Sequence, residues 1–129
     1  MQIQMCVIDR DGVALFKNTM QAIAKSEGLH FLDGSAQTGN ELKIIGVAVG
    51  HDYALSINVG INDRSGYNYA MGGNLGLPAY QIALGFGNGS DQTKARRLSD
   101  RLVKAFSRHW RVETVSVGQG VPPMKSCEG

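Results

Sequence analysis

Residues 80–109, YQIALGFGNGSDQTKARRLSDRLVKAFSRH, contain both kinds of element from which this chain is built. In residues 80–86, large apolar side chains alternate with Gln, Ala and Gly, which is typical of a strand with one buried face. After a turn at 88–90, apolar residues recur at helical spacing and predict a helix over residues 91–109, with Ser90 or Asp91 as its N-cap. The expected core side of this helix is Ala95, Leu98, Leu102, Ala105, Phe106 and His109. A strand followed directly by an amphipathic helix indicates a sheet with a helix packed on it.

Three glycines, Gly85, Gly87 and Gly89, precede this helix and raise the question of a phosphate-binding loop. A dinucleotide fingerprint requires GxGxxG and a P-loop requires GxxxxGK[ST], whereas the spacing here is GxGxG. Asp91 also places a carboxylate where an anion would sit at the helix N-terminus. We therefore interpret these glycines as outward sheet positions and a turn, and expect no phosphate site.

The N-terminal part predicts a strand followed by a second helix. Ile3, Met5 and Val7 alternate with polar or small residues and form the strand. One apolar helix face follows, with Asp11 as the expected N-cap and Gly28 as the expected left-handed residue at the C-terminal end. That face consists of Val13, Phe16, Met20 and Ile23.

The segments between the two helices predict the rest of the sheet. Leu29 and Phe31 begin a short strand, residues 35–41 (SAQTGNE) are expected to form a polar loop, and residues 41–50 (ELKIIGVAVG) an apolar strand. Alternating strands follow at 53–61, 67–77 and 80–86, and a last one at 111–118. The sequence thus predicts an α+β fold: an antiparallel sheet of about five to seven strands with two helices packed on one face, in the order β-α-β-β-β-β-β-α-β. We expect one domain over residues 1–118 and an extended tail over 119–129, because Pro122 and Pro123 cannot continue a helix.

The outward side of the predicted sheet consists of Ser, Asn, Gln, Ala and Gly. A face so small and uncharged is either solvated or covered by a partner, including a second copy of the chain. The tyrosines Tyr53, Tyr67, Tyr69 and Tyr80 are concentrated in the sheet, where we expect core packing; any that point outward would be anchors for a protein partner.

Charge is unevenly distributed along the 129 residues. The net charge is +2, but residues 91–111 carry seven Lys and Arg against two Asp, so this segment is net +5 and the rest is net −3. Five basic residues fall within a helical strip about 80° wide that contains no acidic residue. They are Lys94, Arg97, Arg101, Lys104 and Arg108. This strip is either a solvated helix face or a binding surface for nucleic acid or another polyanion.

No catalytic, metal or cofactor motif is present. His30, His51 and His109 lack a second ligand at metal-binding spacing, and no serine lies in a GxSxG elbow. The acids Asp9, Asp11, Asp33, Glu41, Asp52 and Asp63 fall in predicted turns or strand ends, where a pair meeting in space would leave a small acid/base enzyme as an alternative. We expect no metal and no cofactor.

Cys6 and Cys127 are the only cysteines and lie near opposite ends of the chain. If they pair, the protein belongs in an oxidising compartment and an exported or periplasmic location is favoured; if they are free, the cytoplasm is favoured. No apolar run is long enough to span a membrane.

The sequence as a whole favours a small non-catalytic binding module that acts through protein–protein interaction. Either the small-residue sheet face or the basic helix would carry the partner. Nucleic-acid or polyanion binding through residues 91–109 is the alternative, and a small enzyme is the third hypothesis.

Overall fold

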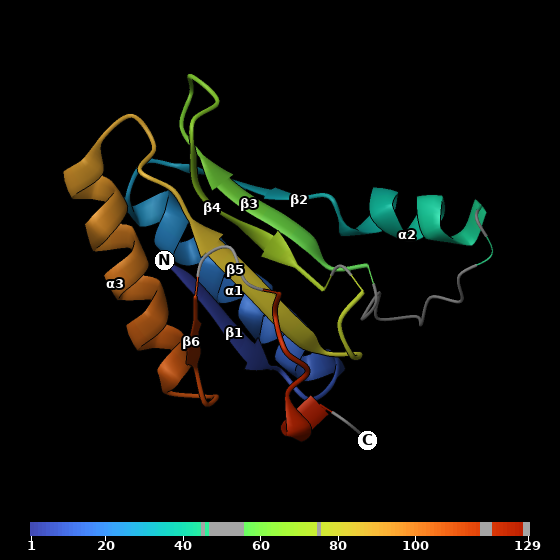
Figure 1. Ribbon diagram of the computed structural model, residues 1–129. Coiled ribbons are helices and arrows are strands. Elements are labelled where there is room, and N and C mark those ends of the chain that lie inside the picture. The colour runs from blue at the N-terminus through green and yellow to red at the C-terminus, as the bar shows by residue number, and fades with distance from the viewer. Residues whose placement is uncertain (45, 47–55, 75, 117–119, 128–129) are drawn as a thin grey trace.

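An antiparallel sheet of six strands carries three helices in the computed structural model (Figure 1). The structure describes residues 1–44, 46, 56–74, 76–116 and 120–127. The strands are β1 (Gln2–Cys6), β2 (His30–Asp33), β3 (Asn58–Asn62), β4 (Asn68–Gly73), β5 (Gln81–Phe86) and β6 (Glu113–Val115). The helices are α1 (Arg10–Ser26), α2 (Ser35–Ile44) and α3 (Gln92–Ser107), with a short 3-10 turn at Lys125–Cys127. The order across the sheet is β2-β3-β4-β5-β1-β6 with every neighbouring pair antiparallel, which confirms the predicted α+β class.

Helices α1 and α3 lie side by side against one face of the sheet (Figure 1). The predicted apolar face of α1 is buried at Val13, Phe16 and Met20, and that of α3 at Ala95, Leu98, Leu102 and Phe106. The rings of Phe16 and Phe106 stack between the two helices, with centroids 5.2 Å apart. Burial of these side chains against the apolar sheet positions forms the single cluster from which the fold draws its hydrophobic stabilisation.

The helix ends follow local capping chemistry, with two corrections. Asp91 caps α3, its carboxylate accepting from the Lys94 N–H at 3.1 Å, and φ of Gly28 is +71° after α1, both as expected. The N-cap of α1 is Asp9 and not Asp11, because Asp9 accepts from the Gly12 N–H at 2.9 Å. His109, which we expected on the core side, is exposed because α3 ends at Ser107.

The prediction for residues 35–44 was wrong. These residues form helix α2 in place of a polar loop and the start of a strand, so the fold has three helices and not two. The carboxylate of Asp33 accepts from the Ser35 N–H at 3.0 Å and compensates the positive end of the helix dipole. Ser35 itself is buried, which fixes the helix start against β3. Residues 45 and 47–50 of the predicted strand lie outside the described residues.

The predicted alternation in β4 is confirmed at Tyr69, which is buried, and is wrong at Ala70 and Met71. Tyr67 and Met71 are 59% and 54% exposed, whereas Ala70 is buried on the helix side of the sheet. A bulge in the pairing of β3 with β4, where Asn62 pairs with Asn68 and Ile61 with Ala70, turns both Tyr69 and Ala70 toward the helices. Tyr69 belongs to the hydrophobic core there, and the turn before α3 packs on its ring: a Cβ placed on Gly89 would come within 2.1 Å of Tyr69 Cζ. Met71 lies on the side of the sheet that α1 and α3 leave open. The predicted strand 53–61 is observed as β3, and residues 53–55, including Tyr53, lie outside the described residues.

Candidate interaction surfaces

The basic strip on α3 is partly engaged within the protein. Glu27, just after α1, accepts from Arg97 Nε at 2.9 and 3.0 Å and from Arg101 Nη1 at 2.9 Å. Arg101 Nη1 also donates to Ser26 Oγ at 2.6 Å. Only 6% of the Glu27 side chain is exposed, so the two guanidinium groups neutralise a buried carboxylate. Two of the five residues proposed from the sequence as an anion-binding strip thus have a structural role.

The electrostatics of Glu27 confirm this role. Burial alone would raise the pKa of the Glu27 carboxyl, but hydrogen bonds from Arg101 and Arg97, together with their charges, hold the pKa below its usual value. The ionised form is therefore the stable one in the folded protein at neutral pH.

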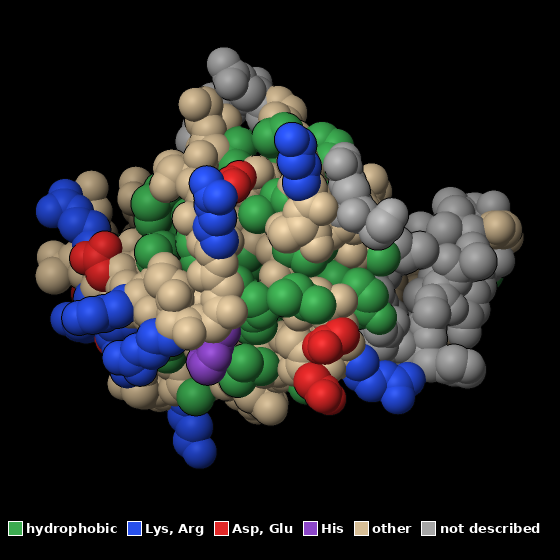
Figure 2. Space-filling model, turned by 90° about the horizontal axis from the view of Figure 1, so that it is seen from below, with side chains coloured by type: hydrophobic (Ala, Val, Ile, Leu, Met, Phe, Trp, Pro, Cys, Tyr) green, Lys and Arg blue, Asp and Glu red, His purple; other side chains and the backbone are tan. Residues whose placement is uncertain are grey.

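The other members of the strip, Lys94, Lys104 and Arg108, form no ion pair among the described residues. Lys and Arg side chains gather on the side of the molecule where α3 lies (Figure 2). Arg101, Lys104 and Arg108 border a hollow of about 290 Å³ whose apolar wall includes Ile23. An anion seated in this hollow would meet two unpaired cations, a smaller site than the five-residue strip.

Two of the three glycines before α3, Gly87 and Gly89, have packing reasons. A Cβ on Gly87 would lie 2.6 Å from the Asn68 carbonyl oxygen, and Gly89 combines φ of +55° with the Tyr69 ring against its Cα. The Tyr69 hydroxyl accepts from the Asp91 N–H at 3.1 Å and so occupies one of the free donors at the start of α3. The β4 backbone close to Gly87 and the Tyr69 ring close to Gly89 account for these two glycines without a phosphate.

The face of the sheet opposite α1 and α3, which we call the helix-free face, has one cross-strand row of alternating size. Pairing places Leu32 on β2 beside Gly60 on β3, Gly60 beside Met71 on β4, and Met71 beside Gly85 on β5. We call these four residues the Met71 row. Leu32 is 52% exposed and Met71 54% exposed, so two large apolar side chains stand among glycines in solvent.

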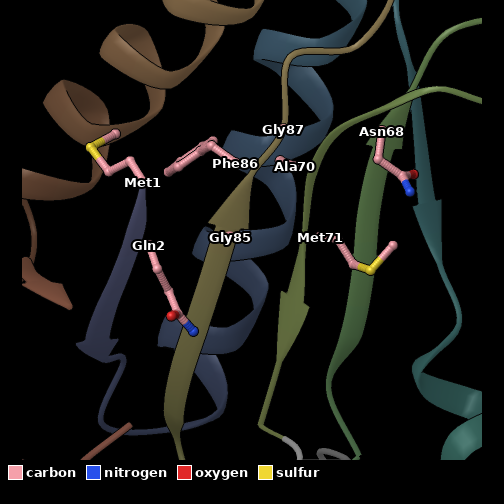
Figure 3. A pocket seen from close by; sticks show the side chains of 8 residues that line it. All are labelled: Met1, Gln2, Asn68, Ala70, Met71, Gly85, Phe86 and Gly87. Carbon is pink, nitrogen blue, oxygen red and sulfur yellow. The ribbon is translucent and has the colours of Figure 1, made fainter. Parts of the chain in front are cut away.

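Hollows lie on both sides of Met71. One of about 400 Å³ lies over Gly85 and one of about 240 Å³ over Gly60. Figure 3 shows the first: the side chains of Met71 and Gln2 stand in front of the sheet, and the backbone at Gly85 lies bare between them. No side chain that lines either hollow is charged.

The glycines of the Met71 row differ from other glycines of the sheet. A Cβ on Gly72 would lie 2.0 Å from the Ala83 carbonyl oxygen and one on Gly73 1.8 Å from the Ile57 carbonyl oxygen, so the fold requires both. Among the described residues, a Cβ on Gly60 or Gly85 would meet nothing closer than 3.5 or 3.7 Å. Glycine within a strand costs about 0.5–1 kcal/mol relative to alanine, and no contact in the described part of the chain explains that cost at these two positions. Such glycines mark places where another molecule approaches the backbone closely.

The C-terminal segment 120–127 closes the other half of the helix-free face. The buried Gln81 amide donates to the Pro122 carbonyl at 2.9 Å and to Gln4 Oε1 at 3.0 Å, and Gln81 Oε1 accepts from the Met124 N–H at 2.8 Å. Cys6 and Cys127 lie at disulfide-bonding distance, with Cα atoms 5.6 Å apart. The segment is thus fastened to β1 and β5 and leaves the Met71 row open.

Several acidic residues have local roles. Asp9 caps α1, and Asp33 caps α2 while pairing with Lys17 at 2.9 Å. Asp63 accepts from Ser90, Ser65 and Tyr67 across a turn; the Ser90 hydrogen bond above all lowers its pKa. Of five hollows in the described part of the chain, none is lined by two acidic side chains.

No group of three His, Cys, Asp or Glu side chains is placed to hold a metal ion among the described residues. No helix within the described ranges is long and apolar enough to cross a membrane. The role of Glu27 could not be predicted from the sequence. Its partners Arg97 and Arg101 lie 70 and 74 residues away, and no local pattern distinguishes Glu27 from other surface acids.

Neither a protein-family model, nor a curated protein, nor a solved structure matches this chain. Its function has to be inferred from its own surfaces.

Proposed function

We propose that this protein is a non-catalytic binding module that acts through protein–protein interaction, and that the helix-free face around Met71 receives the partner. The observation that carries the proposal is the Met71 row, in which exposed apolar side chains alternate with glycines that no close contact within the described ranges explains. Leu32 and Met71 can insert into a partner protein, and the neighbouring glycines allow the partner to approach the backbone of the sheet closely.

The absence of charge on this face bears on the kind of partner. The side chains that line the hollows on both sides of Met71 are uncharged and include the amides of Gln2 and Asn68. A partner that buries these side chains desolvates no charged side chain, and the amides can pair with backbone groups. Binding of this kind depends on apolar contact and is insensitive to salt.

Affinity capture from extracts of the source cells tests the proposal with two matched variants. Met71→Glu places a charge in the helix-free face at a position already exposed, and Lys104→Glu reverses a charge on α3. We expect a protein partner that survives high salt, is lost with Met71→Glu and is kept with Lys104→Glu. A partner kept by Met71→Glu would contradict the proposal.

The basic hollow on α3 favours polyanion binding as a second candidate function. Lys104 and Arg108 border it without an internal partner among the described residues, while Arg97 and Arg101 hold Glu27. Capture of nucleic acid that is released by salt and is lost with Lys104→Glu would establish this alternative.

We propose an exported location on the placement of Cys6 and Cys127. Their disulfide distance is compatible with an oxidising compartment, where such a bond persists. Alkylation of the protein in intact cells, followed by electrophoresis without reductant, tests this: a protein with both thiols alkylated would contradict an oxidising compartment.

A further inference from the structure

We infer that the occupant of the helix-free face is a second copy of this chain, related to the first by a two-fold axis between β3 and β4. This inference rests on the proposed function, because it uses the same face. It names the partner and the register in which the two sheets meet.

The size pattern of the Met71 row is complementary to itself. From β2 to β5 the row is large, small, large, small: Leu32, Gly60, Met71, Gly85. A two-fold axis that runs along the strands between β3 and β4 reverses this order in the second copy. Met71 then lies opposite Gly60 of the second copy, and Leu32 opposite its Gly85. By symmetry each large side chain of both copies meets a glycine, as an isologous interface requires.

The hollows provide the space for this interdigitation. The hollow of about 240 Å³ over Gly60 would receive Met71 of the second copy, and the hollow of about 400 Å³ over Gly85 would receive its Leu32. Two sheets that pack face to face lie about 10 Å apart, and side chains from the two inner faces interdigitate. A glycine opposite each large side chain leaves room for that side chain at this separation.

Electrostatics allow two copies to meet on this face. The side chains that line both hollows are uncharged, so the copies bring no side chains of like charge together there. Helix α3 lies on the other side of the sheet (Figure 1), and its basic residues Arg97, Lys104 and Arg108 are exposed. A face that carried the basic strip would instead repel its own copy.

The C-terminal segment limits where the second copy can sit. It covers the β1 side of the helix-free face, where Gln81 and Met124 hold it and Val121 lines the hollow next to Gly85. With the axis between β3 and β4, strands β2 to β5 of the two copies overlap, and the edge strand β2 of the second copy ends over β5. Strands β1 and β6 and most of the segment therefore stay outside the contact.

The buried area of this contact is small, so we expect a weak dimer. Four strands about 4.8 Å apart span about 20 Å, so the buried area belongs to the lower end of specific interfaces. We expect a reversible dimer whose population depends on concentration.

Sedimentation equilibrium of the full chain, from micromolar to submillimolar concentration, tests the inference with a size-swap series. The wild type should shift from the 13.9 kDa monomer toward twice that mass as concentration rises. Gly60→Met alone sets two methionines against each other and should weaken the dimer about tenfold or more. Adding Met71→Gly restores large against small in the same register and should recover at least half of the lost affinity on a logarithmic scale.

Outcomes that would overturn the inference are equally specific. A monomer at every concentration excludes the second copy as occupant; a partner protein whose capture still depends on Met71 would then leave the proposed function standing. A dimer indifferent to Gly60→Met, or one that the double variant fails to restore, would place the contact elsewhere. Circular dichroism of each variant shows that it is folded, and Gly60→Ala serves as the mild control because its Cβ meets only the Ala70 carbonyl oxygen at 3.5 Å.

Discussion

Replacing Glu27 with glutamine tests whether the basic helix is held by an internal ion pair. The carboxylate accepts from Arg97 and Arg101 at 2.9–3.0 Å while being 6% exposed itself. A buried charge-assisted hydrogen bond contributes about 1.5–3 kcal/mol, but the arginine side chains are 53% and 43% exposed, so each contact is discounted toward the surface value of about 1 kcal/mol. We therefore expect Glu27→Gln to lower the free energy of unfolding by about 2 kcal/mol at pH 7. For a domain of this length that is a fall in Tm of about 8 °C.

Thermal unfolding followed by circular dichroism between pH 7 and pH 3 measures this effect. Because the pKa of Glu27 is lowered in the folded state, its stabilisation is present above the ordinary value of 4.5 and is lost as the pH falls through the folded pKa. The difference between wild type and Glu27→Gln should accordingly shrink below pH 4.5. Lys104→Met, on the exposed side of the same helix, is the control and should change the free energy of unfolding by less than about 0.5 kcal/mol. Equal stability of Glu27→Gln and wild type at pH 7, or an equal loss in the control, would refute the reasoning.

Three further predictions concern the sheet and the C-terminal segment. Gly72→Ala should cost about 1–3 kcal/mol in guanidinium unfolding because of the 2.0 Å approach to Ala83, whereas Gly85→Ala should be neutral or stabilise by about 0.5–1 kcal/mol; similar losses for both would show that the fold does need Gly85. Removing the bridge with Cys6→Ser and Cys127→Ser should lower the free energy of unfolding by about 2–4 kcal/mol, and a wild-type Tm unmoved by reductant would argue against the bridge. Gln81→Leu should speed amide exchange at Met124, whose N–H loses its acceptor; unchanged exchange would mean that the segment is fastened by other contacts.

The elements with strong periodicity were predictable from the sequence. The apolar faces at Phe16 and Met20 of α1 and at Leu98 and Leu102 of α3 are buried as their spacing indicated, because packing and helical period agree there. Residues 35–44 were not predictable in this way, since they contain a glycine, several polar residues and no apolar stripe. Their helix begins at a cap in which Asp33 accepts from the Ser35 N–H, and this cap is visible only when the end of β2 is known.

The candidate site likewise has features that could be predicted from local sequence patterns and features that could not. Small outward residues on the sheet were predictable from alternation, but the position of Met71 among them was not. A bulge in the β3–β4 pairing turns both Tyr69 and Ala70 toward the helices, so the alternation shifts and Met71 lies on the exposed side. The basic strip was correctly placed on one helix face, while its pairing with Glu27 depends on a contact between α1 and α3 that no local pattern reports.

Site-specific photo-crosslinking from position 71 is the most direct measurement of the central claim, that the helix-free face is where this protein binds. A photoreactive side chain replaces Met71 in one sample and Lys104 in another, and the proteins are irradiated in their source cells. We expect a discrete crosslinked protein from position 71, either a second copy of this chain or another protein, and no crosslinked product from position 104. Crosslinks to protein or nucleic acid from position 104 with none from position 71 would contradict this claim.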